Sequence, residues 1–278
     1  MKKITILILI INNFLCANIN VVVSILPQQT FLQAIGGDKV NVTLMVKPGN
    51  SPHTYEPKPS QMKAISNADV YFSIGVEFEK AWLQRFKNQN SNMKIFDISK
   101  GIEKIDIKKH EHKHKNHNED EAKDPHIWTS PTNVKVIAKN IYAELIKIDK
   151  NNKVYYKSNL DKFLLHVDKT DQKIKDIFKQ KKIKFMVFHP SWGYFAKEYN
   201  LIQIPIEVEG KSPKPKKLKH LIKKAKEEKV SVIFTSPEFS NAIAKQIANE
   251  LKIPVVKVSP LNPNWSKNLV DFSKYIAN

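Results

Sequence analysis

The chain contains little cysteine, arginine or glycine: one cysteine, one arginine and seven glycines in 278 residues. The scarcity of glycine excludes a collagen-like or linker-dominated chain. The single arginine, Arg85, stands among 46 basic residues, and the formal net charge is +19. Arginine is the residue that makes bidentate contacts to bases and phosphates, and the lysines look scattered along the sequence. We therefore expect a solvated lysine-rich surface and no nucleic-acid partner.

The only cysteine, Cys16, lies in a segment that resembles a secretory leader. A charged start at residues 1–3 precedes an apolar run, residues 4–11, which is too short to span a bilayer. Small residues follow, so we expect residues 1–17 to be a signal peptide that is cleaved after Ala17. A lipoprotein anchored through Cys16 is the alternative, although the residues before it resemble a lipobox poorly. With cleavage after Ala17, the mature chain would contain no cysteine and therefore no disulfide, no cysteine-metal cluster and no thiol chemistry.

Hydrophobic residues make up 41% of the chain and charged residues 26%, which is typical of a globular protein. Strand patterns alternate with helical patterns in both halves, as expected for parallel sheets flanked by helices. Between the halves lies the longest helical periodicity, without glycine or proline. We predict an α/β protein with two Rossmann-like lobes, residues 18–150 and 182–278, joined by one long rigid helix over residues 151–181.

A polar segment, residues 108–123, interrupts the first lobe. It is rich in histidine, lysine and acidic residues and has no large apolar side chain that could anchor it to a core. Its four histidines are His110, His112, His114 and His117. We expect a surface loop that serves as an auxiliary, weaker zinc-binding element, and the alternative is a charged loop that binds nothing.

Three other histidines share a different setting. His53, His126 and His189 each lie in a loop beside a predicted strand or helix, whereas His166 and His220 lie within helical patterns. Ligands of open α/β sheets bind at the carboxyl ends of the strands, and three imidazoles suit Zn²⁺. Their spacing in the sequence does not exclude the alternative that three unrelated loop histidines occur there by coincidence.

The sequence resembles the periplasmic metal-binding proteins of zinc and manganese ABC importers, specifically the ZnuA type, over essentially the whole mature chain. The most specific matches are residues 47–69 around His53, the DPHIW segment around His126, the FHPSWGYF segment around His189, and residues 207–219. The resemblance implies that His53, His126 and His189 are the metal ligands, in a cleft between two lobes. A histidine at the third position is similar to zinc-type members, and manganese-type members have a carboxylate there.

The chain departs from this family pattern at the fourth ligand. Many relatives have an aspartate where this chain has Ser259, so water or a neighbouring glutamate such as Glu238 would complete the coordination. Some zinc-type relatives also have an acidic residue where this chain has Pro52.

The resemblance implies a non-enzymatic protein that captures Zn(II) in the periplasm and delivers it to the membrane permease of an ABC importer, and we expect a monomer. A manganese- or iron-binding member of the same family is the first alternative. A zinc hydrolase with three histidine ligands is the second, because such sites can keep an open position for water; no HExxH motif supports it.

Overall fold

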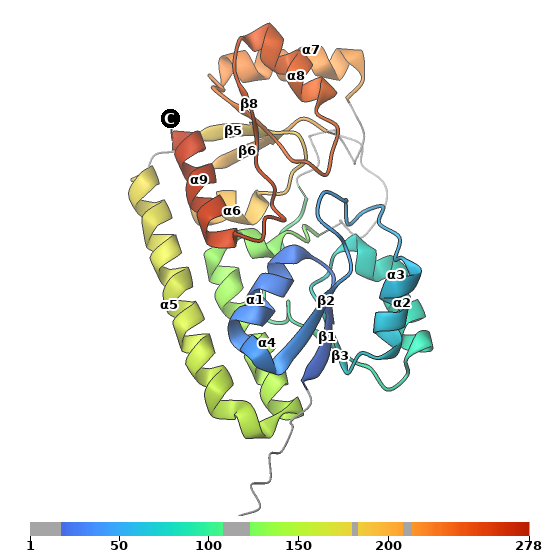
Figure 1. Cartoon of the computed structure of the whole chain (residues 1–278). Coiled ribbons are helices and arrows are strands. Elements are labelled where there is room, and N and C mark those ends of the chain that lie inside the picture. The colour runs from blue at the N-terminus through green and yellow to red at the C-terminus, as the bar shows by residue number, and fades with distance from the viewer. Residues whose placement is uncertain (1–17, 108–122, 180–182, 208–212, 278) are drawn as a thin grey trace, which may run out of the picture.

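The computed structural model describes residues 18–107, 123–179, 183–207 and 213–277. The predicted leader and nearly all of the histidine-rich segment, including its four histidines, lie outside these ranges. Within them, two four-stranded parallel sheets form two lobes (Figure 1), as the sequence predicts. None of the described helices combines the length and the apolar character needed to cross a membrane.

The first sheet has the strand order β2-β1-β3-β4. Its central strand, β1, is fully apolar in Val21, Val22 and Val23, all about 1% exposed, as expected for a parallel strand covered on both faces. The elements of this lobe are β1 (Ile19–Val23), α1 (Leu26–Gly36), β2 (Val40–Leu44), α2 (Pro59–Ser66), β3 (Val70–Ser73), α3 (Glu77–Gln89), β4 (Lys94–Asp97) and α4 (Pro131–Ile148).

The second sheet repeats this arrangement with the order β6-β5-β7-β8. In each sheet the next two strands in the chain lie on opposite sides of the lobe's first strand, which is β1 in one sheet and β5 in the other. Open α/β sheets bind ligands at such a switch point, outside the carboxyl ends of the strands. The elements are β5 (Lys184–Val187), α6 (Gly193–Glu198), β6 (Ile202–Pro205), α7 (Pro215–Glu227), β7 (Ile233–Thr235), α8 (Ala242–Leu251), β8 (Val255–Lys257) and α9 (Trp265–Ala277).

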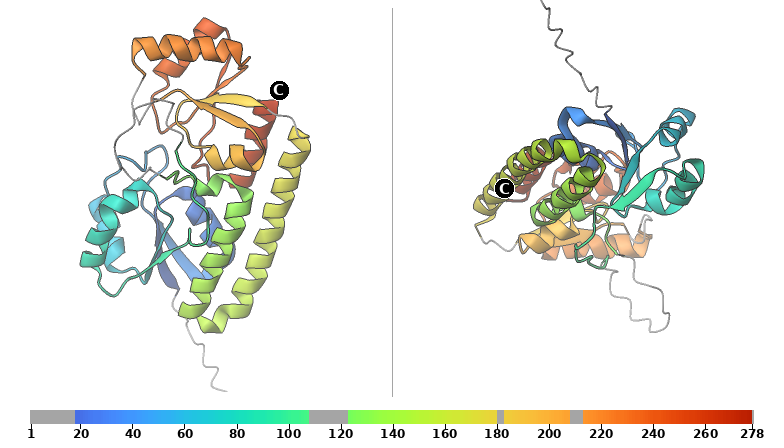
Figure 2. Two further views of the ribbon diagram at one scale, coloured as in Figure 1. Left: turned by 180° about the vertical axis from the view of Figure 1, so that it is seen from behind. Right: turned by 90° about the horizontal axis from the view of Figure 1, so that it is seen from below.

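The long helix between the lobes is α5 (Lys153–Phe178), and it runs along one side of both lobes in Figure 2. At 1.5 Å per residue its 26 residues span about 39 Å. Its buried positions recur every three or four residues, from Tyr156 to Phe178. It packs against α1 and α4 of the first lobe and against α9.

The chain after β8 returns to the first lobe and fastens the two lobes together. The indole of Trp265 donates a hydrogen bond to the carbonyl of Trp128 (2.7 Å), and its ring packs edge-on against Phe31. In the other direction, the indole of Trp128 donates to the carbonyl of Pro260 (2.9 Å). These buried contacts cross the boundary between the lobes and favour one fixed orientation, with little room for a wide hinge motion.

Candidate metal centre

The carboxyl ends of both sheets face one small cavity of about 20 Å³. Segments that follow five different strands line it: His53 after β2, Glu77 after β3, His189 after β5, Glu238 after β7 and Pro260 after β8. His126, which precedes α4, completes the histidine set. The topology therefore gathers residues that are far apart in the sequence at the place where the strand-end rule predicts a ligand.

The structure brings the three predicted histidines together. The ring centres of His53 and His189 lie 5.2 Å apart, and those of His126 and His189 lie 5.3 Å apart. Two imidazoles bound to one tetrahedral zinc through bonds of about 2.0–2.1 Å have ring centres roughly 5 Å apart. In the described ranges, no group of three or more His, Cys, Asp or Glu side chains has metal-ligand geometry.

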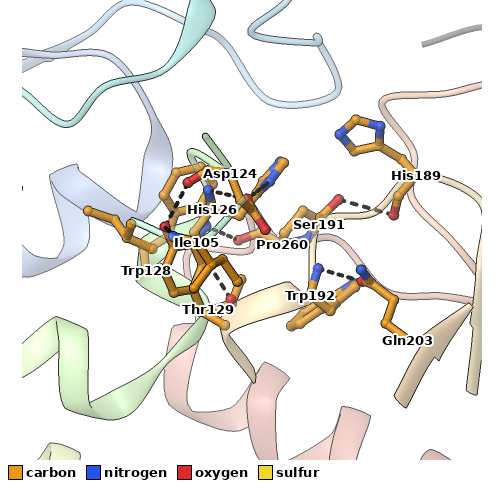
Figure 3. A network of polar contacts seen from close by, with 12 residues as sticks. Ile105, Asp124, His126, Trp128, Thr129, His189, Ser191, Trp192, Gln203 and Pro260 are labelled. Atoms are coloured by element: carbon orange, nitrogen blue, oxygen red, sulfur yellow. Dashed lines mark hydrogen bonds and ion pairs between the residues drawn. The ribbon is translucent and has the colours of Figure 1, made fainter. Parts of the chain in front are cut away.

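His126 is held by the carboxylate two residues before it. Oδ1 of Asp124 lies 2.7 Å from Nδ1 of His126 and also accepts a hydrogen bond from the backbone N–H of His126 (2.9 Å) (Figure 3). The sharp turn that allows both contacts lies just before α4, whose N-terminus is capped by the side chain of Ser130. With Nδ1–H donating to Asp124, Nε2 of His126 keeps a free lone pair.

His189 has an equivalent carboxylate partner. Its Nδ1 lies 2.8 Å from Oε1 of Glu207, which follows β6, the strand beside β5. The ring of Phe239 stacks on the imidazole, with centres 4.5 Å apart. Nε2 of His189 is buried and has no hydrogen-bond partner among the described residues. A buried polar atom without a partner is rare and costs free energy, and a metal ion would satisfy this one.

His53 is the most exposed of the three, with 32% of its side chain accessible against 10% for His126 and 11% for His189. Its Nδ1 lies 3.5 Å from Oε2 of Glu77. Burial lowers the pKa of His53; His189 and His126 act in the same direction, whereas the Glu77 carboxylate opposes the shift. A lowered pKa favours the neutral imidazole, which is the form that binds metal.

Of the two candidates for the fourth ligand, Glu238 lines the cavity and Ser259 does not. Ser259 donates a hydrogen bond from Oγ to Oε1 of Glu238 (2.6 Å) and accepts one from the backbone N–H of Leu261 (3.0 Å). Glu238 lines the cavity with the three histidines, and its Oε2 is buried without a hydrogen-bond partner in the part of the chain that the structure describes. The cavity therefore contains a second unsatisfied atom, and it is an oxygen that can bind a metal.

The two histidines that sequence analysis placed within helical patterns do not line the cavity. His166 is exposed on α5 and His220 is exposed on α7. Sequence analysis missed the three carboxylates behind the imidazoles, Glu77, Asp124 and Glu207. Two of them follow strands, as His53 and His189 do, so the strand-end rule would have found them.

Comparison with known proteins places the chain among metal-transport proteins. The family model ZnuA, described as the periplasmic component A of a zinc-uptake complex, matches residues 21–278. The "High-affinity zinc uptake system protein ZnuA" of Bacillus subtilis is 32% identical over 241 residues, covering 84% of this chain and 75% of the relative. The "Manganese ABC transporter substrate-binding lipoprotein PsaA" of Streptococcus pneumoniae is 31% identical over 235 residues, covering 80% and 73%.

Solved structures agree over nearly the whole chain. A crystal structure of ZnuA is 43% identical with a TM-score of 0.87, covering 94% of this chain and 98% of that one. A zinc-bound deletion mutant of ZnuA, also 43% identical, has a TM-score of 0.86 and covers 94% and 97%. The relatives are substrate-binding proteins of metal ABC transporters, and this chain belongs to the ZnuA family.

Proposed function

We propose that this protein captures Zn(II) in the periplasm and delivers it to the permease of an ABC importer, with His53, His126 and His189 as ligands. The observation that carries the proposal is the buried Nε2 of His189, which has no partner within the described ranges and whose ring lies about 5 Å from the rings of both other histidines. Carboxylates beside all three Nδ1 atoms would orient the rings and increase their basicity.

The donor set favours zinc over manganese. Imidazole suits Zn²⁺, whereas Mn²⁺ is better served by carboxylate and carbonyl oxygens. A histidine from the second lobe, His189, supplies nitrogen where the resemblance associates manganese-type members with a carboxylate. Because several relatives are named as manganese-binding proteins, manganese is the second candidate cargo.

Glu238 is our candidate for the fourth ligand, in place of the aspartate that Ser259 replaces. Its Oε1 is fixed by Ser259, and its buried Oε2 is free to bind. One carboxylate ligand would also neutralise part of the charge that Zn²⁺ brings into a cavity whose lining includes the apolar side chains of Trp128, Phe239 and Leu261.

Binding and delivery, without catalysis, are the roles that we assign to the site, in a monomer exported with its leader cleaved after Ala17. Anchoring through Cys16 is the alternative, since several relatives are named as lipoproteins. The histidine-rich segment, with His110, His112, His114 and His117, would then be an auxiliary zinc-binding element that assists capture when zinc is scarce.

Competitive titration of the purified protein with zinc and manganese tests the assignment. We expect one tight zinc per molecule that excess manganese does not displace; displacement by equimolar manganese would make manganese the cargo. Calorimetry of a variant lacking residues 109–118 separates the two histidine groups. The deletion should remove only weaker additional binding, and loss of the tight site would place that site in the deleted segment.

A further inference from the structure

The lysines of α7 are not scattered, in contrast to the expectation from sequence. Lys216, Lys219, Lys223 and Lys226 recur at steps of three and four residues, and all four are exposed. Residues with this spacing share one face of a helix, so these four form what we term the α7 lysine stripe. The opposite face packs into the second lobe through Leu221 and Ala225, which are no more than 1% exposed.

The positive charge on α7 is offset by fewer acidic residues than the positive charge on α5. Its 13 residues contain six lysines and one glutamate, whereas α5 contains six lysines and four aspartates. Lys223 and Lys226 each have an acidic neighbour, Glu227 at 3.7 Å and Glu250 at 3.5 Å. Exposed pairs at these distances are weak and strongly screened, so they leave most of the positive potential of the stripe in place.

We propose that the α7 lysine stripe docks the protein on an anionic phospholipid surface. The apolar face of α7 packs into the protein core, so it is not available for insertion into a lipid bilayer. The face of α7 that is left for a partner is the charged one. Lysine is a compact, hydrated point charge, suited to a fluid layer of headgroups rather than to shaped, bidentate recognition. Each lysine close to an anionic membrane adds to the attraction, which falls off within a Debye length.

The position of the stripe is compatible with metal binding. In Figure 1, α7 lies at the outer end of the second lobe, beyond its sheet and away from the end where α4 meets α5. No residue of α7 lines the cavity between the lobes. Docking through α7 would therefore hold the protein at the membrane with its metal site unobstructed, and shorten its search for a membrane-bound partner.

Co-sedimentation with phospholipid vesicles tests the proposal. The probes are phosphatidylcholine vesicles with and without about 30% phosphatidylglycerol, an anionic content chosen to give a clear negative surface potential. The stripe variant is Lys216→Gln/Lys219→Gln/Lys223→Gln/Lys226→Gln. The matched control is Lys153→Gln/Lys162→Gln/Lys169→Gln/Lys173→Gln on α5, which removes the same charge from exposed positions with no ion pair in the described residues. Glutamine and lysine have similar helix propensities.

We expect the wild type to bind anionic but not neutral vesicles at low salt and to be released as salt is raised. The stripe variant should bind at least about tenfold more weakly, and the α5 control should stay within about twofold of the wild type. Failure to bind anionic vesicles, or an equal loss in both variants, would overturn the proposal. Zinc affinity should be unchanged in both variants, so this test is separate from the proposed function.

Discussion

Gly193 and Asp124 approach each other across the boundary between the two lobes. A Cβ atom on Gly193 would lie 2.6 Å from Oδ2 of Asp124, closer than real Cβ contacts allow. The neighbouring Tyr194 donates a hydrogen bond from its hydroxyl to the backbone carbonyl of Asp124 (2.8 Å). The start of α6 therefore fixes, from the second lobe, the carboxylate that orients His126 in the first.

Gly193→Ala should weaken zinc binding by about 10- to 100-fold, the usual effect of losing an outer-shell partner. Asp124 is buried and its Oδ1 contacts His126 twice, so a methyl group that pushes on Oδ2 should shift the carboxylate and disturb those contacts. Calorimetry of Gly193→Ala, Asp124→Asn and the double variant checks this. The double variant should be little worse than the weaker single variant; fully additive losses would mean that Gly193 acts by another route.

Glu238→Gln should lower zinc affinity by about tenfold or more, because a neutral amide oxygen is a poorer ligand than a carboxylate. Ser259→Ala should have a smaller effect, since Ser259 only orients Oε1. Glu144→Gln is the control: that glutamate also has a buried oxygen without a partner among the residues described, but it lies on α4 and does not line the cavity. Equal zinc affinities in all three variants and the wild type would leave water as the fourth ligand.

Zinc affinity should fall on acidification, by more than about tenfold between pH 7 and pH 5.5. An imidazole must be neutral to bind metal, and its unperturbed pKa is about 6.5. Burial lowers the pKa of His53, so this ligand should resist protonation to a lower pH. Titrations at a series of pH values measure the effect, and an affinity that stayed constant over this window would contradict histidine coordination.

Glu79→Gln should change how stability depends on pH. Burial raises the pKa of Glu79 to about 7, although its carboxylate accepts hydrogen bonds from Ser24 and from the backbone N–H groups of Ile74 and Gly75. The folded state therefore holds this proton above the pH at which the unfolded state loses it. In the wild type, this group lowers the free energy of unfolding as pH rises from about 4.5 to about 7.

Glutamine resembles the protonated glutamate, so the variant should lack this slope. Relative to the wild type, its free energy of unfolding should rise by roughly 2–3 kcal/mol between pH 4.5 and pH 8. Urea unfolding across this range measures the difference. The control is Glu103→Gln, whose side chain is 88% exposed and which should follow the wild type at every pH. If Glu79→Gln also follows it, the Glu79 carboxyl titrates normally.

Much of the fold could be predicted because both lobes consist of local βα patterns. The buried run of β1 and the periodicity of α5 are visible in consecutive residues. The return of the chain after β8 was not predictable in this way. The contacts of Trp265 with Trp128 and Phe31 join residues more than 130 positions apart. Patterns in neighbouring residues cannot predict contacts over such a distance in the sequence.

The meeting of the three histidines could be predicted from the sequence, and so could two of the carboxylates beside them, because Glu77 and Glu207 follow strands. His53 and His189 stand at strand ends and His126 stands in a family motif; that these three histidines bind the metal stays a prediction. Gly193 was not recognisable, because its role depends on an oxygen atom in the other lobe. The choice between Ser259 and Glu238 likewise depended on which side chain lines the cavity.

Zinc titration of His189→Ala beside His166→Ala tests the account most directly. His189 is the only proposed histidine ligand from the second lobe, and its buried Nε2 has no hydrogen-bond partner in the described residues, whereas His166 is an exposed histidine on α5. We predict that His189→Ala nearly abolishes tight zinc binding while both variants remain folded by circular dichroism, and that His166→Ala keeps the wild-type affinity. Full zinc affinity in His189→Ala would contradict the proposed metal centre.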